Sequence, residues 1–245
     1  MIAAIATAVA AIAIWQPGPG TSFQIQLDGT VDTTVDAQVY EIDGFDNTAD
    51  TVATLHAQGR KAVCYIDAGT WENWRPDAAT FPKDVLGKQN GWPGERWLDV
   101  RRLDVLQPIM RKRFDMCRAK GFDAIEADNV DGYQNATGFP LTAADQLAYN
   151  RWLAKAAHNR GLAIGLKNDP EQVGDLLPSF DFSVAEQCFQ YDECDKLVPF
   201  VQAGKAVFDI EYELSPSSYC AKAASLGLTA IRKKLGLRAW RVACP

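Results

Sequence analysis

Short β-prone runs alternate with helical stretches along most of this chain, and many of the runs end in a charged residue. The runs are 39–43 (VYEID), 61–67 (KAVCYID), 96–100 (RWLDV), 123–128 (DAIEAD), 162–167 (LAIGLK), 182–186 (FSVAE), 205–211 (KAVFDIE) and 229–233 (TAIRK). The helical stretches between them include 51–59, 105–121, 142–161, 194–204 and 217–227, and several end in a glycine, a common helix stop. This alternation predicts a single-domain (β/α)8, or TIM, barrel.

The main alternative is an open, doubly wound sheet. Such sheets usually carry a glycine-rich phosphate loop after the first strand, and no strand of this sequence is followed by one. Residues 23–29 (FQIQLDG) read as an additional N-terminal strand outside the eight. The expected fold is therefore a (β/α)8 barrel with one extra strand.

The chain begins with an apolar run of small residues, MIAAIATAVAAIAIW. At about 14 residues it is shorter than the roughly 20 that a membrane-spanning helix needs, so no stable membrane span is predicted. It resembles the core of a secretory signal but lacks the usual preceding Lys or Arg. We assign residues 1–20 to a signal-like or tether segment and linker, and residues 21–245 to the barrel. The expected location is secreted or extracellular, with a short tether as the alternative.

Six cysteines form an even set with no Cys-x-x-Cys pair. This spacing does not support a zinc knuckle or a thioredoxin-type redox site, and disulfides are expected in an exported chain. Six cysteines allow fifteen pairings. Our interpretation pairs Cys188 with Cys194, Cys220 with Cys244, and Cys64 with Cys117, against buried free thiols as the alternative.

Charge restricts the partners. The net charge of −6 and the pI near 5.0 argue against nucleic acid or an anionic membrane as the main partner and favour a cationic or neutral ligand.

Alternate residues of a β-strand face opposite sides of the sheet. One parity is apolar, and the other carries most of the charge, which predicts a polar, acidic barrel interior near the C-terminal mouth, where such barrels keep their active sites. The residues assigned to that interior are Glu41, Asp43, Tyr65, Asp67, Trp97, Asp99, Glu126, Asp128, Lys167, Glu186, Asp209, Glu211 and Arg232.

The available chemistry is that of carboxylates. The two histidines, His56 and His158, fall in helical segments, and no G-x-S-x-G elbow is present, so a histidine base, a zinc hydrolase and an acyl-transfer triad lack support. Two facing carboxyls can divide into an acid and a nucleophile or base, as in most glycosidases. Trp71, Trp74 and Trp92 could stack on sugar rings, or simply pack. We expect the deeper Glu126 and Asp209 to pair with Lys167 and Arg232.

Several long blocks, in order, carry a resemblance to a known family. They are YEIDGFD (40–46), CYIDAGTWENWRPDAATFP (64–82), WPGERWLDVR (92–101), GFDAIEADNVDGYQNATGFPLT (121–142), GLAIGLKND (161–169), VAEQCFQYDECD (184–195) and GKAVFDIEY (204–212). Together they resemble glycoside hydrolase family 114, the endo-α-1,4-polygalactosaminidases, over nearly the whole chain. The resemblance implies a barrel that cleaves internal α-1,4 links between galactosamine units of a cationic polysaccharide.

The resemblance also implies roles for residues. It gives Asp128 as nucleophile or stabiliser and Glu186 as acid/base, with no cofactor and no metal. The expected substrate-contacting or supporting residues are Asp43, Asp67, Glu72, Trp74, Arg75, Asp99, Asn129, Asp131, Tyr133, Lys167, Asn168 and Glu211.

Two other functions stay open at this point. One is a non-catalytic barrel that binds a cationic amino-sugar polymer, and the other is a metal-dependent enzyme with an oxygen-only Mg²⁺ or Ca²⁺ site. We expect a monomer that binds amino-sugar polymer and no nucleic acid.

Overall fold

The computed structural model describes residues 14–245. The predicted export or tether segment, 1–20, lies mostly outside the described residues. Within the described range, no helix combines the length and apolar character needed to cross a membrane.

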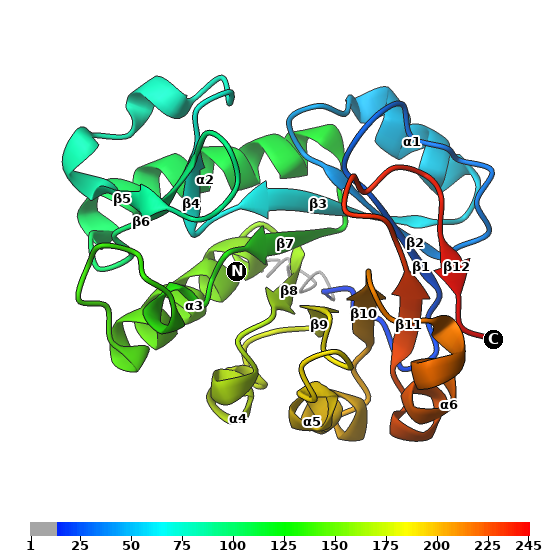
Figure 1. Cartoon of the computed structure of the whole chain (residues 1–245). Helices are drawn as coiled ribbons and strands as arrows, with labels where there is room; N and C mark the ends of the chain where they lie inside the picture. The colour runs from blue at the N-terminus through cyan, green and yellow to red at the C-terminus, as the bar shows by residue number, and fades with distance from the viewer. Residues whose placement is uncertain (1–13) are drawn as a thin grey trace, which may run out of the picture.

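A nine-stranded sheet forms the centre of the molecule, with the order β1-β2-β3-β7-β8-β9-β10-β11-β12. Its strands are β1 (Phe23–Gln26), β2 (Val39–Asp43), β3 (Lys61–Asp67), β7 (Ala124–Asp128), β8 (Ala163–Lys167), β9 (Phe182–Glu186), β10 (Val207–Glu211), β11 (Thr229–Arg232) and β12 (Val242–Ala243). All neighbours from β1 to β11 are parallel, and β12 is antiparallel to β11. The sheet curls, with helices around its outside (Figure 1). This is the α/β, TIM-barrel-like architecture that the alternation predicts.

Five of the helices of residues 14–245 lie close to their predicted positions, and the short helix Val173–Leu176 was not predicted. The helices are α1 (Ala49–Ala57), α2 (Leu103–Lys120), α3 (Ala143–His158), α4 (Val173–Leu176), α5 (Val198–Gln202) and α6 (Pro216–Leu226). Thr142 and Asp145 form a capping box at the start of α3, which satisfies backbone N–H groups there. Gly121 and Gly227 end α2 and α6 in the left-handed conformation that glycine adopts without strain.

Two strand predictions need correction. Residues 23–26 do form a strand, but β1 is one of the eight mutually parallel strands of the described chain and not an extra one. The predicted barrel strand 96–100 is instead β6 (Glu95–Leu98), which pairs antiparallel with β4 (Thr70–Glu72) and β5 (Leu86–Gln89) in a small separate sheet. Figure 1 shows this sheet beside the curled one. Strand-forming residues look alike in either sheet, so composition could not name the pairing partner.

Two apolar clusters fix which way the strands face. One joins strand residues to helix residues such as Phe114 and Leu153, and so lies between sheet and helices. The other contains no helix residue and lies inside the curled sheet. Phe208, Ile210, Tyr212 and Ile231 belong to the interior cluster. Its other members are Phe23, Ile25, Val39, Val63, Ala124, Ala163, Phe182, Val184 and Ala206.

The interior assignment of Asp209, Glu211 and Arg232 was therefore wrong. These residues alternate with the interior residues of β10 and β11, so they face the opposite way. Both faces of β10 are buried, and burial on both faces removes the difference between core and solvent sides that sequence alternation relies on.

The three predicted disulfides are present. Cys64–Cys117 joins β3 to α2, Cys188–Cys194 closes the loop after β9, and Cys220–Cys244 ties the C-terminus to α6. The pairing prediction is confirmed.

Candidate active site

Asp128 ends β7 and lies at the mouth of the curled sheet. Its carboxylate accepts hydrogen bonds from the Tyr65 hydroxyl at 2.9 Å, the Lys167 ammonium at 2.8 Å and the Asn129 backbone N–H at 2.8 Å. Three donors on one carboxylate hold it in a single orientation and favour its charged form.

Glu186 ends β9, two strands away from Asp128 in the sheet order. The Tyr212 hydroxyl donates a hydrogen bond to its carboxylate. The Lys167 ammonium lies 3.1 Å from Glu186 Oε2 and 2.8 Å from Asp128 Oδ1, so one cation bridges the two carboxylates. The strand between them, β8, supplies that cation.

The charges of Asp128 and Lys167 depend on each other. Burial raises the pKa of Asp128, but the Lys167 ammonium and the hydrogen bonds outweigh burial and hold the pKa below its usual value. Burial also acts to lower the pKa of Lys167, but Asp128, Glu186 and Glu126 together raise that pKa well above its usual range. The site therefore holds an ionised Asp128 beside a permanently charged lysine at neutral pH.

A buried carboxyl pair lies below this cation. Glu126 is completely buried, and its Oε1 lies 3.6 Å from Lys167 Nζ, so the expected ion pair is present with a long contact. Glu41 is also buried, and burial raises the pKa of its carboxyl above the ordinary value. Burial and the neighbouring Glu41 raise the pKa of Glu126 well above its ordinary value.

Sharp backbone turns follow the three strands that carry these groups. Asn129, Asn168 and Gln187 come directly after β7, β8 and β9, and all three have positive φ, at 59°, 50° and 59°. Non-glycine residues seldom adopt this conformation, and it is concentrated at functional sites. The turn at Asn129 directs its own N–H to Asp128, and Asn168 Oδ1 accepts the N–H of Glu186 at 3.0 Å.

Gly69 allows the ends of β3 and β7 to meet. A Cβ at this position would lie 1.6 Å from the Asn129 carbonyl oxygen, so any side chain would push the backbone of Asn129 away. The Gly69 N–H donates to the carbonyl of Asp128 at 3.0 Å.

A cavity of about 610 Å³ surrounds the carboxylate pair. Of the predicted site residues, Asp128, Glu186, Asn129, Asp131, Lys167 and Asn168 line it. The wall also contains Tyr65, Glu126, Glu95, Trp92, Trp97, Gln187, Tyr212, Asn90, Asn135, Ile25, Leu27, Leu235 and Leu237. Trp92 is 56% exposed, and an exposed ring beside a polar cavity is a suitable surface for a sugar face.

The other predicted contact residues lie outside this wall. Arg75 is buried and forms ion pairs with Asp43 and Glu72, at 2.7 Å in each case. The charged groups of these three side chains are therefore paired with one another and do not face the cavity. Asp67 is buried and accepts from Asn129 Nδ2 at 2.9 Å, so it supports a residue of the wall.

The remaining four are Asp99, Trp74, Tyr133 and Glu211. Asp99 pairs with Arg101 at 2.7 Å, and Trp74 is 52% exposed away from the cavity wall. The Tyr133 hydroxyl accepts from Gln134 Nε2 at 2.8 Å. Glu211 is buried on the helix side of β10 and binds the loop after β9.

Tyr212 and Glu95 are the main residues that the sequence prediction missed. Tyr212 follows β10 by one residue and continues the interior face of Phe208 and Ile210. A correct prediction of which β10 residues face the interior would therefore have identified Tyr212. Glu95 comes from the inserted small sheet, and barrel periodicity cannot place a residue of an insertion.

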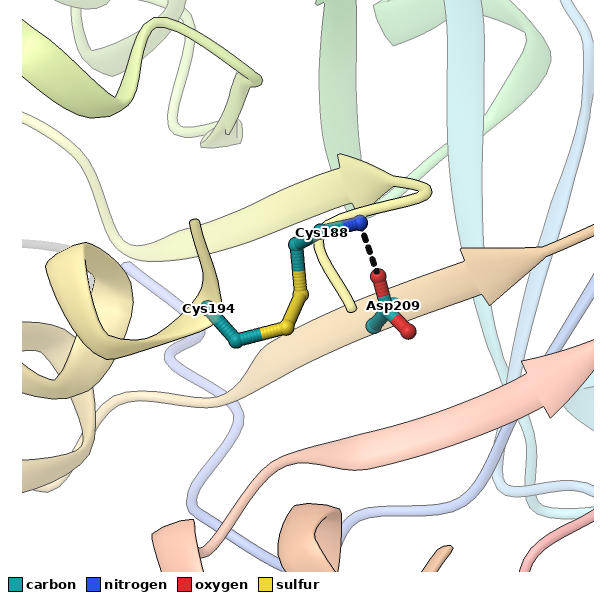
Figure 2. Close-up of side chains that lie close together, drawn as sticks. All are labelled: Cys188, Cys194 and Asp209. Carbon is teal, nitrogen blue, oxygen red and sulfur yellow. Dashed lines mark hydrogen bonds between the residues drawn. A yellow bond between two sulfur atoms is a disulfide. The ribbon is translucent and has the colours of Figure 1, made fainter. Parts of the chain in front are cut away.

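Two groups of side chains in the described residues have the proximity that a metal ion needs. Asp67, Glu72 and Glu95 form the first, but Thr70, Arg75 and Asn90 already donate to their carboxylates. In the second, Cys188 and Cys194 are joined by a disulfide and Asp209 accepts the Cys188 N–H, as Figure 2 shows. Disulfide sulfurs are poor metal ligands, because the thiolate is the binding form.

Comparisons with known proteins identify the family of the chain. The chain is similar to a crystal structure of Aspergillus fumigatus Ega3 in complex with galactosamine, with 42% identity, a TM-score of 0.89, and coverage of 94% of this chain and 97% of that chain. It also shares its fold with the glycoside hydrolase domain of PelA from Pseudomonas aeruginosa, at 15% identity and a TM-score of 0.70 over 92% of this chain and 99% of that chain.

A protein of Deinococcus radiodurans is 29% identical over 186 residues, or 66% of this chain. The chain spans 59% of the length of that relative. The model of the glycoside-hydrolase family GH114 matches residues 4–245. With a carboxylate pair at the mouth of a TIM-barrel-like sheet, the chain belongs to glycoside-hydrolase family GH114.

Proposed function

We propose that this glycoside hydrolase cleaves internal α-1,4 links of galactosamine polymers, with Asp128 and Glu186 as its catalytic pair. The observation that carries the proposal is the pair itself: two carboxylates at one cavity, bridged by the ammonium of Lys167. The related Ega3 structure contains galactosamine, which supports an amino sugar as the substrate unit.

In this proposal Asp128 is the nucleophile and Glu186 the acid/base. Glu186 gives its proton to the glycosidic oxygen as the bond to the leaving sugar breaks, and Asp128 Oδ2 or Oδ1 bonds to the anomeric carbon. Water then attacks that carbon, Glu186 takes the proton from the water, and Asp128 leaves as a carboxylate. The depressed pKa of Asp128 suits the nucleophile, because it must be ionised before the first step.

The spacing favours retention of configuration. Both contacting oxygens lie within 3.1 Å of Lys167 Nζ, so they cannot be farther apart than about 6 Å. Inverting enzymes separate their carboxyls by about 6.5–9.5 Å to admit a water, and retaining enzymes by about 5–5.5 Å.

We infer three further properties of the whole chain. Residues 21–245 form the catalytic domain, the protein is secreted, and it acts as a monomer. The disulfides support an oxidising location, since such bonds persist mainly outside the cytosol.

We also infer that the eight parallel strands close into a barrel through the segment after β11. In support, Leu27 N–H donates to the Leu237 carbonyl at 2.9 Å and Gln24 Nε2 to the Ala239 carbonyl at 2.7 Å, which joins β1 to that segment.

Product analysis tests the function. Soluble α-1,4-polygalactosamine and the same polymer after chemical N-acetylation are incubated with the enzyme, and reducing ends, product sizes and the first anomer are measured. We expect short oligomers from the free-amine polymer, released from internal positions with the α anomer formed first. Absence of new reducing ends from the free-amine polymer would refute the proposed substrate. Formation of the β anomer first would refute retention of configuration and leave the proposed substrate intact.

A further inference from the structure

A second cavity of about 200 Å³ adjoins the first. The two share Asp131, Asn168 and Glu186, so they meet at the acid/base of the proposed reaction. The rest of its lining comes from the turns after β7 and β8, from β9 itself and from the segment after β9. These residues are Gln134, Pro170, Ala185, Cys188, Tyr191, Glu193 and Leu197.

The loop after β9 is held rigidly where it borders this cavity. The Cys188–Cys194 disulfide closes it, and Asp209 Oδ1 accepts the Cys188 N–H at 3.3 Å (Figure 2). Glu211 Oε1 accepts the next two backbone N–H groups, those of Phe189 and Gln190, at 2.8 and 3.3 Å. Three consecutive N–H groups are thus bound by two buried carboxylates of β10, which fixes the loop before any ligand arrives.

This fixed loop presents an aromatic side chain to solvent. Tyr191 is 61% exposed, and among the described residues no hydrogen bond is made by its hydroxyl. Exposure of a large ring on a cross-linked loop has no use for stability, because the ring is scarcely removed from water. A ring at the rim of a cavity can instead cover the apolar face of a sugar.

Asp131 supplies a free charge to the same cavity. It is partly buried and forms no ion pair within residues 14–245, whereas Glu193 is already bound to Lys196 at 3.1 Å. Burial and the nearby Asp128 raise the pKa of Asp131 to about 6, so it is mostly charged at neutral pH and lacks a counterion. An ammonium group would provide one.

We propose that this cavity is a second sugar subsite, which takes the galactosamine unit next to the one held between Asp128 and Glu186, with its ring on Tyr191 and its ammonium on Asp131. The inference rests on the proposed function and adds the place and the contacts of a neighbouring sugar.

Binding to the inactive variant Glu186→Gln tests the subsite apart from hydrolysis. Calorimetry in this background, with and without Tyr191→Ala, compares an α-1,4-galactosamine tetramer with free galactosamine. We expect Tyr191→Ala to weaken tetramer binding about tenfold, as for the loss of one stacking contact, and to leave the monosaccharide unchanged. Tyr191→Phe keeps the ring and should bind the tetramer like its parent.

Equal tetramer affinity with and without Tyr191→Ala would overturn the subsite and leave the proposed function intact. No tetramer binding by Glu186→Gln itself would instead count against the proposed function. Thermal unfolding of each variant serves as the structural control, since an exposed side chain contributes little to stability.

The ammonium contact has its own test in the same background. Asp131→Asn should bind the free-amine tetramer about tenfold more weakly and the N-acetylated tetramer no more weakly than its parent, because only the free amine carries a charge. An equal loss for both tetramers would overturn the assignment of the ammonium to Asp131.

Discussion

At the scale of single residues, Lys167 determines the charge state of the proposed site. It is almost fully buried, and it contacts the two carboxylates of the proposed pair, Asp128 and Glu186, and the deeper Glu126. A buried cation among three carboxylates keeps more than one of them ionised at short range, which isolated carboxylates could not achieve.

Replacement of this cation should change both rate and pH dependence. In Lys167→Met the pKa of Asp128 is expected to rise, because burial then acts without the opposing ammonium. The nucleophile must be ionised, so the acid limb of the kcat/KM profile should move to higher pH, and kcat/KM at neutral pH should fall about 100-fold or more.

Lys61→Met is the matched control for this variant. Lys61 lies at the opposite end of the strands and pairs with Asp123 at 2.7 Å, so its loss should leave the profile unchanged. An unshifted acid limb in Lys167→Met would show that the lysine does not set the charge of Asp128.

Elements of the fold were predictable to different degrees. Helix positions followed from glycine stops and from helical patterns, because these signals are local. The facing of β10 was not predictable, because VFDIE has an apolar face and an acidic face and the structure buries both. The small sheet was mistaken for a barrel strand, because pairing depends on residues far away in the sequence.

The same difference between local signals and long-range contacts applies to the residues of the site. Strand parity placed Asp128, Glu186 and Lys167 in the interior with several other polar residues, and all three do end central strands. The family resemblance, and not the parity, singled out Asp128 and Glu186 as the proposed pair. The charges of Asp43, Glu72 and Arg75 look like those of ligand-contacting residues. They form instead a buried ion-pair network, which assembles only once the segment of the small sheet has folded against β2. Residue type alone does not distinguish these two uses of charge.

The disulfides also differ as elements of stability. Cys64–Cys117 closes a sequence separation of 53 residues and Cys188–Cys194 one of 6, so chain entropy predicts losses of about 4 and about 2 kcal/mol when each pair is removed. Unfolding of Cys64→Ala/Cys117→Ala and Cys188→Ala/Cys194→Ala in urea measures both. A larger loss of unfolding free energy from the shorter loop would contradict the entropic ranking.

At the scale of the whole molecule, charge suits a cationic polymer. The net charge of −6 is accompanied by five carboxylates in the wall of the main cavity: Glu95, Glu126, Asp128, Asp131 and Glu186. Lys167 balances part of that charge and leaves the cavity acidic. Attraction of this kind acts over about one Debye length, roughly 10 Å at 0.1 M salt.

Salt should therefore weaken the reaction with charged substrate. We expect kcat/KM on free-amine polymer to fall about tenfold between 0.02 and 0.5 M NaCl, because long-range attraction speeds encounter and is screened. The N-acetylated polymer is the uncharged control, and any activity on it should vary little. A flat response with the free-amine polymer would rule out electrostatic capture.

The most direct test of the central claim is the release of reducing ends from α-1,4-polygalactosamine by Asp128→Asn and Glu186→Gln beside the unaltered enzyme. Both changes keep size and hydrogen-bonding shape, so circular dichroism should match the parent. We predict that each variant loses at least about 1000-fold of kcat, since each removes a covalent or proton-transfer step. Turnover near that of the parent in either folded variant would contradict the assignment of Asp128 and Glu186 as the catalytic pair.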